Sequence, residues 1–258
     1  MNMYFASTHA DFFYLHYLGV ISAIKTQQVD KIVLICTVPP EGYYADKLKG
    51  LVEFQQFTID DFSQFRHATS QLKAAHSKDY IQWVTLLANG GIFADLDTIS
   101  INSLSGLLGS FDVIASPRYL PTFFSQVSYE SAVVVAKKNS VVVNDTLRFA
   151  LQALNGNEPK YQTTGPIAYT KAINLHKNVV GFPGLDVLSP RIKPLLKGLQ
   201  NRYVPVWDNI PVPSNCYILH IFASTADLTK IDKDWVAVSN TMYAKAIKQV
   251  LTRDEWYV

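Results

Sequence analysis

Cysteine and long apolar runs are both scarce in this sequence. The two cysteines, Cys36 and Cys216, form neither a C-x-x-C pair nor a ligand cluster, which predicts buried thiols in a reducing compartment, although a disulfide between them stays open. The longest apolar run, IVLICTV at 32–38, has the length of a strand, whereas a membrane helix needs roughly 20 residues. The first residues, MNMYFASTHADFF, lack the basic and apolar regions of a signal peptide. We therefore expect no transmembrane segment and a cytoplasmic location.

Charge of one sign is also missing. The chain of 258 residues has 23 Lys and Arg against 21 Asp and Glu, a net charge of +2, with no run of like charges and no basic stripe. It therefore lacks the field that attracts a nucleic-acid backbone, and we expect no nucleic-acid partner. Hydrophobic residues make up 48% and charged residues 17%, which is typical of a packed globular protein with one main domain.

The order of apolar segments predicts an α/β fold. Short buried runs alternate with segments of helical spacing, and this alternation favours a largely parallel sheet flanked by helices. The predicted strands are 3–7, 31–38, 51–57, 91–94, 98–101, 112–116 and 131–138, and the predicted helices are 11–25, 69–89, about 141–154 and 164–176. After Gly181 the sequence is richer in proline and less periodic, so we expect loops and short strands that cover one side of a site.

Two aspartates stand out in GGIFADLDTISI, residues 90–101. In a regular strand Asp95 and Asp97 would share one face, where two carboxylates repel each other unless a cation or water screens them. They directly follow a buried strand, where α/β sheets place their ligands. A second D-x-D, Asp232 and Asp234 in IDKDW, has no such context and is explained by a solvated turn. The first pair therefore predicts a site for Mn²⁺ or Mg²⁺.

Two chemistries use this arrangement. In one, a divalent ion joins the aspartates to the diphosphate of a nucleotide-sugar and neutralises the leaving group. In the other, DLDT is similar to the D-x-D-x-T of haloacid-dehalogenase-like phosphatases, with Asp95 as nucleophile and Asp97 as general acid. Those enzymes have further acidic ligands downstream, and no adjacent Asp pair or G-D-x-x-x-D follows Asp97. The nucleotide-sugar chemistry is therefore favoured.

The segment AHSKDYIQWVTLLANGGIFADLDTISI, residues 75–101, resembles the D-x-D region of GT-A fold glycosyltransferases, and glycosyltransferase family 32 in particular. In that family a helix with S-D-x-x-R-x-x-x-L leads into G-G-I-Y-x-D-x-D. Asp79 falls on the helix Asp, and Gln82 replaces the Arg. TTGP at 163–166 looks like the T-G-P that opens the acceptor-side helix. YILHIFAST at 217–225 looks like the C-terminal H-x-x-x-S segment.

The resemblance implies a GT-A fold and a metal-dependent hexosyl transfer. The donor would be a nucleotide-sugar, UDP-linked by family analogy, the acceptor a glycan or glycoconjugate, and the anomeric configuration would be retained. The chain would form one domain over 1–258, with a nucleotide-binding half at 1–100 and an acceptor side and closing segment at 101–258. Asp95 and Asp97 with His220, which completes the family's metal shell, would hold Mn²⁺ or Mg²⁺. Asp79 would join the two aspartates as a catalytic residue.

The remaining site residues each have a simpler explanation. Gln82 would donate a hydrogen bond to the donor sugar from an open cleft but brings no charge, which also leaves open a non-catalytic sugar-nucleotide-binding protein. Asp79 is otherwise a surface carboxylate beside Lys78, and Lys230 a solvated lysine. The other assignments are Ser7 and Thr8 for the base and ribose (otherwise a helix-start turn), Ser224 with Lys230 for the diphosphate, and Thr164, Gly165 and Pro166 for the acceptor. No role is assigned to His9, His16, His67, His76 or His176, which lack ligand spacing.

Overall fold

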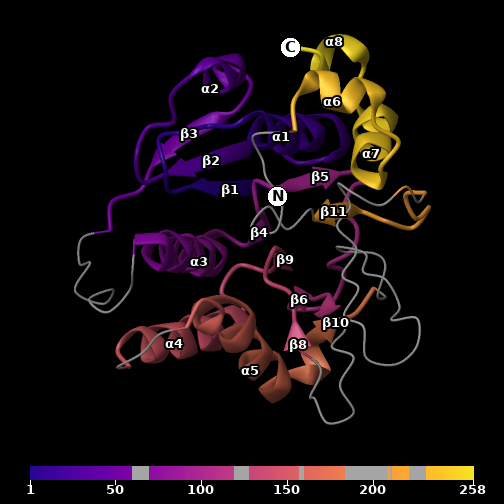
Figure 1. Ribbon diagram of the computed structural model, residues 1–258. Helices are drawn as coiled ribbons and strands as arrows, with labels where there is room; N and C mark the ends of the chain where they lie inside the picture. The colour runs from indigo at the N-terminus through magenta and orange to yellow at the C-terminus, as the bar shows by residue number, and fades with distance from the viewer. Residues whose placement is uncertain (60–69, 119–127, 157–159, 184–208, 210, 221–230) are drawn as a thin grey trace, which may run out of the picture.

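The computed structural model describes residues 1–59, 70–118, 128–156, 160–183, 209, 211–220 and 231–258 (Figure 1). The strands are β1 (Met3–Ser7), β2 (Ile32–Cys36), β3 (Glu53–Gln56), β4 (Gly91–Ala94), β5 (Thr98–Ser100), β6 (Val113–Ile114), β7 (Pro117–Arg118), β8 (Ser128–Tyr129), β9 (Val133–Ala136), β10 (Val180–Gly181) and β11 (Ile218–His220). The α-helices are α1 (Tyr14–Thr26), α2 (Tyr43–Leu48), α3 (Ser70–Asn89), α4 (Val141–Leu154), α5 (Ala168–Leu175), α6 (Lys233–Val238), α7 (Met242–Val250) and α8 (Arg253–Trp256). A π-helical turn, η2 (Thr163–Ile167), precedes α5, and a 3₁₀ turn, η3 (Lys177–Val179), follows it.

The described strands form one seven-stranded sheet and two small ones. The large sheet has the order β10-β6-β9-β4-β1-β2-β3. Its pairs are parallel except at β9, which runs antiparallel to both β4 and β6. The predicted α/β class with a mostly parallel sheet is confirmed.

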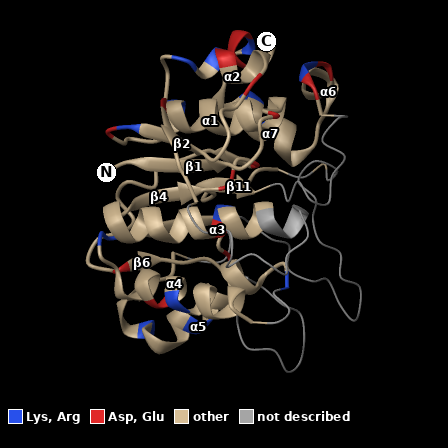
Figure 2. Ribbon diagram, turned by 90° about the vertical axis from the view of Figure 1, so that its left-hand side faces the viewer, with Lys and Arg blue, Asp and Glu red and all other residues tan. Residues whose placement is uncertain are grey.

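Helices cover both faces of the large sheet, so the molecule has two hydrophobic cores (Figures 1 and 2). Side chains alternate along β1: Met3 and Phe5 pack in the core under α1 and α7, while Tyr4 and Ala6 pack in the core under α3, α4 and α5. A strand buried on both faces reads as a continuous apolar run, which explains why MYFAS and IVLIC were recognisable in the sequence.

Helix α3 leads directly into the central strand of the site. It ends at Asn89, and Gly90 follows it with a positive φ of 66°, as expected for a residue that closes a helix. Strand β4 then runs beside β1 with Met3 opposite Ile92 and Tyr4 opposite Phe93. The chain therefore leaves the sheet at Asp95, at the carboxyl edge that β1 and β2 share.

The end of the chain differs from the prediction. Residues 231–258 contain three helices, α6, α7 and α8, in place of the expected loops and short strands. Buried side chains of Val236, Tyr243, Ile247 and Trp256 pack them against the core beneath α1. Tyr14 and Tyr17 of α1 also donate hydrogen bonds to the backbone of Trp256 and Glu255.

Both cysteines are buried free thiols, as predicted. None of the described helices is both long and apolar enough to cross a lipid bilayer.

Candidate functional site

Asp95 and Asp97 lie on the tight turn between β4 and β5, outside any regular strand. The Asp95 amide donates to the Ala132 carbonyl at 2.8 Å, and Thr98 Oγ1 donates to the Asp95 carbonyl at 2.7 Å. These bonds hold the turn at the edge of the sheet. Both carboxylates remain partly exposed, with side-chain exposures of 20% for Asp95 and 16% for Asp97.

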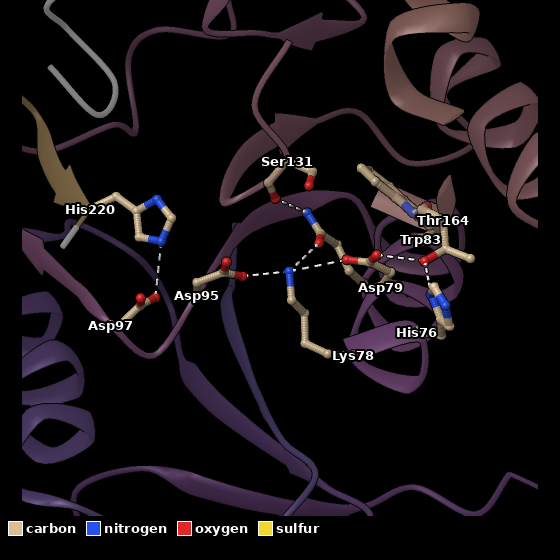
Figure 3. Close-up of polar contacts among 10 residues, drawn as sticks. His76, Lys78, Asp79, Trp83, Asp95, Asp97, Ser131, Thr164 and His220 are labelled. Atoms are coloured by element: carbon tan, nitrogen blue, oxygen red, sulfur yellow. Dashed lines mark hydrogen bonds and ion pairs between the residues drawn. The ribbon is translucent and has the colours of Figure 1, made fainter. Parts of the chain in front are cut away.

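A distant segment completes the turn. Strand β11 pairs antiparallel with β5, and this register sets His220 opposite Thr98, next to Asp97. His220 Nε2 lies 3.2 Å from Asp97 Oδ1 (Figure 3). One ligand atom each from Asp95, Asp97 and His220 can be chosen so that all three lie within 4.8 Å of one another. The predicted meeting of these three residues is therefore confirmed, while their role as metal ligands stays a prediction.

The electrostatics of the turn favour a cation. Burial raises the pKa of Asp95 and the neighbouring Asp97 adds to this, whereas Lys78 and His220 act in the opposite direction. A raised pKa means that the negatively charged carboxylate is less stable here than it is in water. A positive ion between the carboxylates would relieve that cost.

Lys78 of α3 lies at the centre of the site, although no role was assigned to it from the sequence. Its Nζ is 2.6 Å from Asp95 Oδ1, 3.3 Å from Asp79 Oδ1 and 3.2 Å from Gln82 Oε1 (Figure 3). Burial alone would lower the pKa of this ammonium, but the Asp95 and Asp79 carboxylates raise it above its ordinary value. Lys78 therefore stays positively charged between two carboxylates.

Asp79 lies deeper, at the junction of α3 and η2. Thr164 Oγ1 donates to Asp79 Oδ2 at 2.7 Å, and His76 Nδ1 lies 2.6 Å from the same hydroxyl oxygen (Figure 3). Because the threonine proton goes to the carboxylate, the imidazole is the donor to Thr164. Trp83 Nε1 also donates to the Thr164 carbonyl at 2.8 Å. Asp79 is thus a buried carboxylate, 6% exposed, and not a surface one.

The predicted acceptor-side residues lie in this same network. Thr164 and Gly165 are buried in η2, and Pro166 is partly exposed. A Cβ on Gly165 would lie 2.7 Å from Asp79 Oδ2 and 2.9 Å from Ser131 Oγ. A side chain at position 165 would therefore displace the Asp79 carboxylate or the Ser131 hydroxyl. Their contact with an acceptor stays a prediction.

Gln82 does not face an open cleft. Its side chain is fully buried, Nε2 donates to the Ser131 carbonyl at 2.8 Å, and Oε1 accepts from Lys78. A glutamine has the size and hydrogen-bonding groups to fill such a closed position. The expectation of an open cleft was wrong, because position 82 was placed by the family pattern and burial was not visible in the sequence.

The other predicted donor-side residues divide into two groups. Ser7 is the last residue of β1 and Thr8 follows it. Extending the β1–β4 register sets Ala6 level with Asp95, so Ser7 and Thr8 lie at the same edge of the sheet. Ser7 is buried and its hydroxyl donates to the His9 carbonyl at 3.0 Å. Ser224 and Lys230 lie outside the described residues.

Two residues near the turn were not found by sequence reasoning. His16, in the first turn of α1, is partly buried, and burial lowers the pKa of its imidazole to about 4, with Asp97 opposing. Tyr161, just before η2, is 57% exposed; partial burial and the nearby Asp95 raise the pKa of its phenol. The sign of them in the sequence is that His16 follows β1 and Tyr161 precedes TTGP. This sign can be interpreted only once the fold is known.

The second D-x-D of the chain, Asp232 and Asp234, has a structural role. The Asp232 carboxylate caps α6 by accepting from the Trp235 amide at 2.7 Å, and Asp234 accepts from the Tyr257 hydroxyl at 2.8 Å. Both aspartates are exposed. The same D-x-D spacing therefore serves a helix start in one place and a clustered site in the other.

Several solved structures that superpose on this chain are glycosyltransferases. The PaToxG glycosyltransferase superposes with a TM-score of 0.54 at 18% identity, over 68% of this chain and 69% of its own. The galactosyltransferase LgtC, solved with donor and acceptor sugar analogues, gives 0.51 at 14% identity over 98% and 97%. The glycosyltransferase GlyE of Streptococcus pneumoniae gives 0.52 at 14% over 96% and 62%. The predicted GT-A fold is confirmed by these neighbours.

Sequence likeness is weaker and partial. Toxin Afp18 of Yersinia ruckeri is 24% identical over 113 residues, which are 43% of this chain and 5% of the toxin. A toxin of Photorhabdus asymbiotica is 24% identical over 126 residues, 48% of this chain and 4% of the toxin. This chain therefore corresponds to a small part of each relative. No protein-family model matches the sequence.

Proposed function

We propose that this chain is a metal-dependent glycosyltransferase that moves a hexosyl group from a nucleotide-sugar, UDP-linked by analogy with family 32, to a glycan or glycoconjugate. The observation that carries the proposal is the cluster of Asp95, Asp97 and His220 at the carboxyl edge of a GT-A sheet. Ligands bind at this edge in open α/β sheets.

The residues of the cluster fit a divalent ion. Two carboxylates and one imidazole within 4.8 Å of one another are donors that Mn²⁺ accepts readily, and Mg²⁺ would use the carboxylates. An ion held there would neutralise the diphosphate of the donor as the glycosidic bond breaks. Asp97 and His220 would fix its position, because the β5–β11 pairing holds them together.

The chain's own residues suggest how a donor would be oriented. Ser7 and Thr8 at the end of β1 would meet the base and ribose, and Ser224 with Lys230 the diphosphate. Asp79 and Gln82, held by Lys78, Thr164 and Ser131, would form the floor beneath the sugar. Thr164, Gly165 and Pro166 would border the acceptor. We propose transfer with retention, in which the leaving phosphate assists the incoming hydroxyl.

The test is release of UDP from a panel of UDP-sugars with Mn²⁺. We expect turnover with at least one donor, and loss of turnover in Asp97→Asn. Asp234→Asn is the matched control, because it removes the same charge from the second D-x-D. We also expect UDP to raise the Tm more with Mn²⁺ than with EDTA, because a ligand of the native state stabilises by mass action.

Other outcomes separate the alternatives. Release of phosphate from small phosphoesters would favour the phosphatase with Asp95 as nucleophile. Binding of a UDP-sugar without any turnover would favour a non-catalytic sugar-nucleotide-binding protein. Equal Tm shifts in Mn²⁺ and EDTA would remove the metal from the proposal.

A further inference from the structure

Three protein side-chain oxygens surround the Lys78 ammonium. Asp95 Oδ1, Asp79 Oδ1 and Gln82 Oε1 surround Nζ at 2.6, 3.3 and 3.2 Å. An ammonium carries donors and no acceptor, and here it forms ion pairs with Asp95 and Asp79 and donates a hydrogen bond to Gln82. The side chain is 21% exposed and reaches the site along α3 (Figure 3). Lys78 is therefore built as an internal counter-ion and not as a ligand-binding lysine.

The charges of the site support this role. Asp79, Asp95 and Asp97 contribute three negative charges, and a metal-ligating imidazole such as that of His220 is neutral. Lys78 compensates one of the three, which leaves a site of two negative charges. That remainder equals the charge of one divalent cation. Without the ammonium, the same site would suit an ion of higher charge and would hold a divalent ion more tightly.

We propose that Lys78 is a positioning residue that tunes the metal site of Asp95, Asp97 and His220 to a divalent ion and orients Asp95 toward it. This inference rests on the proposed metal site. The ammonium pairs with one oxygen of Asp95 from the side of α3, which would leave the other acceptor positions of the carboxylate for an ion shared with Asp97 and His220. Its positive charge also repels the bound ion and limits the ion's affinity.

The position of this cation explains the glutamine at 82. Lys78 and Gln82 are four residues apart on α3 and share one face, where they contact each other directly. In the pattern that the sequence resembles, the positive charge comes from position 82. Here it comes from one helical turn earlier, and the amide of Gln82 serves as an acceptor for it.

The test measures metal binding by protein free of donor and stripped of metal, using calorimetric titration with Mn²⁺ and with Tb³⁺. We expect Lys78→Met to bind Mn²⁺ at least about tenfold more tightly than wild type, because the repulsion between ammonium and ion is removed. The gain for Tb³⁺ should be larger than that for Mn²⁺, because the repulsion scales with ion charge. A purely structural ion pair would not shift the ratio of the two affinities.

Two controls keep the test informative. Lys31→Met removes an exposed lysine that pairs with Glu53 at the other end of the strands, and it should leave both affinities unchanged. The double variant Lys78→Gln/Gln82→Arg restores one cation from the adjacent turn and should return both affinities to within about threefold of wild type. Where Lys78→Met does not fold, Lys78→Gln alone replaces it, and the same tighter binding of both ions is expected.

The results distinguish the two proposals. If Lys78→Met and wild type bind Mn²⁺ with equal affinity, or if the ratio of Tb³⁺ to Mn²⁺ affinity is unchanged, the proposed role of Lys78 is wrong. The proposed metal site is not affected by that result. If wild type binds no divalent ion, the metal site itself is wrong and the role of Lys78 falls with it. A third result is that the protein shows the expected changes in Mn²⁺ and Tb³⁺ affinity and yet releases no UDP from any UDP-sugar. That result would support the role of Lys78 and contradict the proposed transferase activity.

Discussion

A buried amide at position 82 constrains what can replace it. Gln82 is fully enclosed and uses both ends of its side chain, toward the Ser131 carbonyl and toward Lys78. We expect Gln82→Arg alone to destabilise the fold by about 1–3 kcal/mol, because it overpacks the position and adds a second cation beside Lys78. The Tm should fall by roughly 5 °C in a thermal melt. Gln249→Arg, on the exposed face of α7, is the control and should leave the Tm unchanged. An unchanged Tm for Gln82→Arg would mean that the position is more open than the structure shows.

His16 should make the fold sensitive to mild acid. Burial lowers the pKa of this imidazole to about 4, below its ordinary value of 6.5. The unfolded chain therefore binds the proton first, and the stability is fully present above pH 6.5 and is lost as the pH falls toward 4. In EDTA, we expect the loss of Tm between pH 7 and pH 5 to be smaller for His16→Gln than for wild type. Parallel pH profiles for the two proteins would contradict this.

At the residue scale, the sequence predicted the three clustered residues better than the residues that support them. Asp95 and Asp97 were recognisable because they follow a buried strand, and His220 because of a family motif. Lys78 was not, because a lysine next to an aspartate on a helix is usually solvated, and nothing local shows that its ammonium lies between Asp79 and Asp95. The open-cleft expectation for Gln82 failed for the same reason: a single sequence shows spacing but not enclosure.

Helix α1 supports the site through close contacts at Gly19 and Ser22. A Cβ on Gly19 would lie 2.5 Å from the Leu96 carbonyl oxygen and 2.9 Å from that of Thr98, both on the turn and strand beside Asp97. Ser22, one turn later, accepts the Ser100 amide at 3.0 Å. The helix therefore packs directly on the backbone that carries the aspartates.

We expect Gly19→Ala to lower stability, although alanine is the better helix former by about 1 kcal/mol in an exposed helix. The added methyl must push α1 away from rigid backbone, at a cost of about 1–3 kcal/mol. The Tm should fall, and the Mn²⁺-dependent rise in Tm should shrink because the turn moves. Gly106→Ala is the control, since a Cβ there meets open space. A Tm for Gly19→Ala at or above that of wild type would show that α1 can shift freely.

At the element scale, strong periodicity made α3 and α4 predictable, while α6, α7 and α8 were missed. The three missed helices are 4 to 9 residues long, too short for a clear apolar period. Their caps were nevertheless visible in the sequence: Asp232 and Thr241 each accept the amide three residues later, and Thr252 forms a capping box with Glu255. Weighing caps as well as periodicity would have predicted these helices.

The whole molecule brings the site together through pairing that no local pattern specifies. The chain leaves the large sheet after β4, and β5 pairs instead with β11, more than a hundred residues later in the chain. The Ile101 amide donates to the Tyr217 carbonyl at 2.8 Å, and Asn102 Nδ2 donates to the Cys216 carbonyl at 2.6 Å, which extends the contact beyond the strands. The resemblance predicted that His220 returns to the aspartates, whereas the antiparallel ladder that brings it there could be seen only in the structure.

Because β5 and β11 pair with each other, we predict that a metal ion bound at the turn slows hydrogen exchange in both strands. An ion that joins Asp97 to His220 binds only the closed arrangement of β5 and β11, so it should lower the population of locally open states. At a free ion concentration of about 100 times the dissociation constant, the stabilisation approaches about 2.7 kcal/mol, or roughly a hundredfold slower hydrogen exchange.

We expect Mn²⁺ to slow exchange at the amides of Thr98–Ser100 and Ile218–His220 to a similar degree. Asp97→Asn should abolish the effect in both segments, while β3, at the far edge of the sheet, should be unaffected wherever its amides exchange by local opening. Protection of β5 without β11 would mean that His220 does not share the ion with the aspartates.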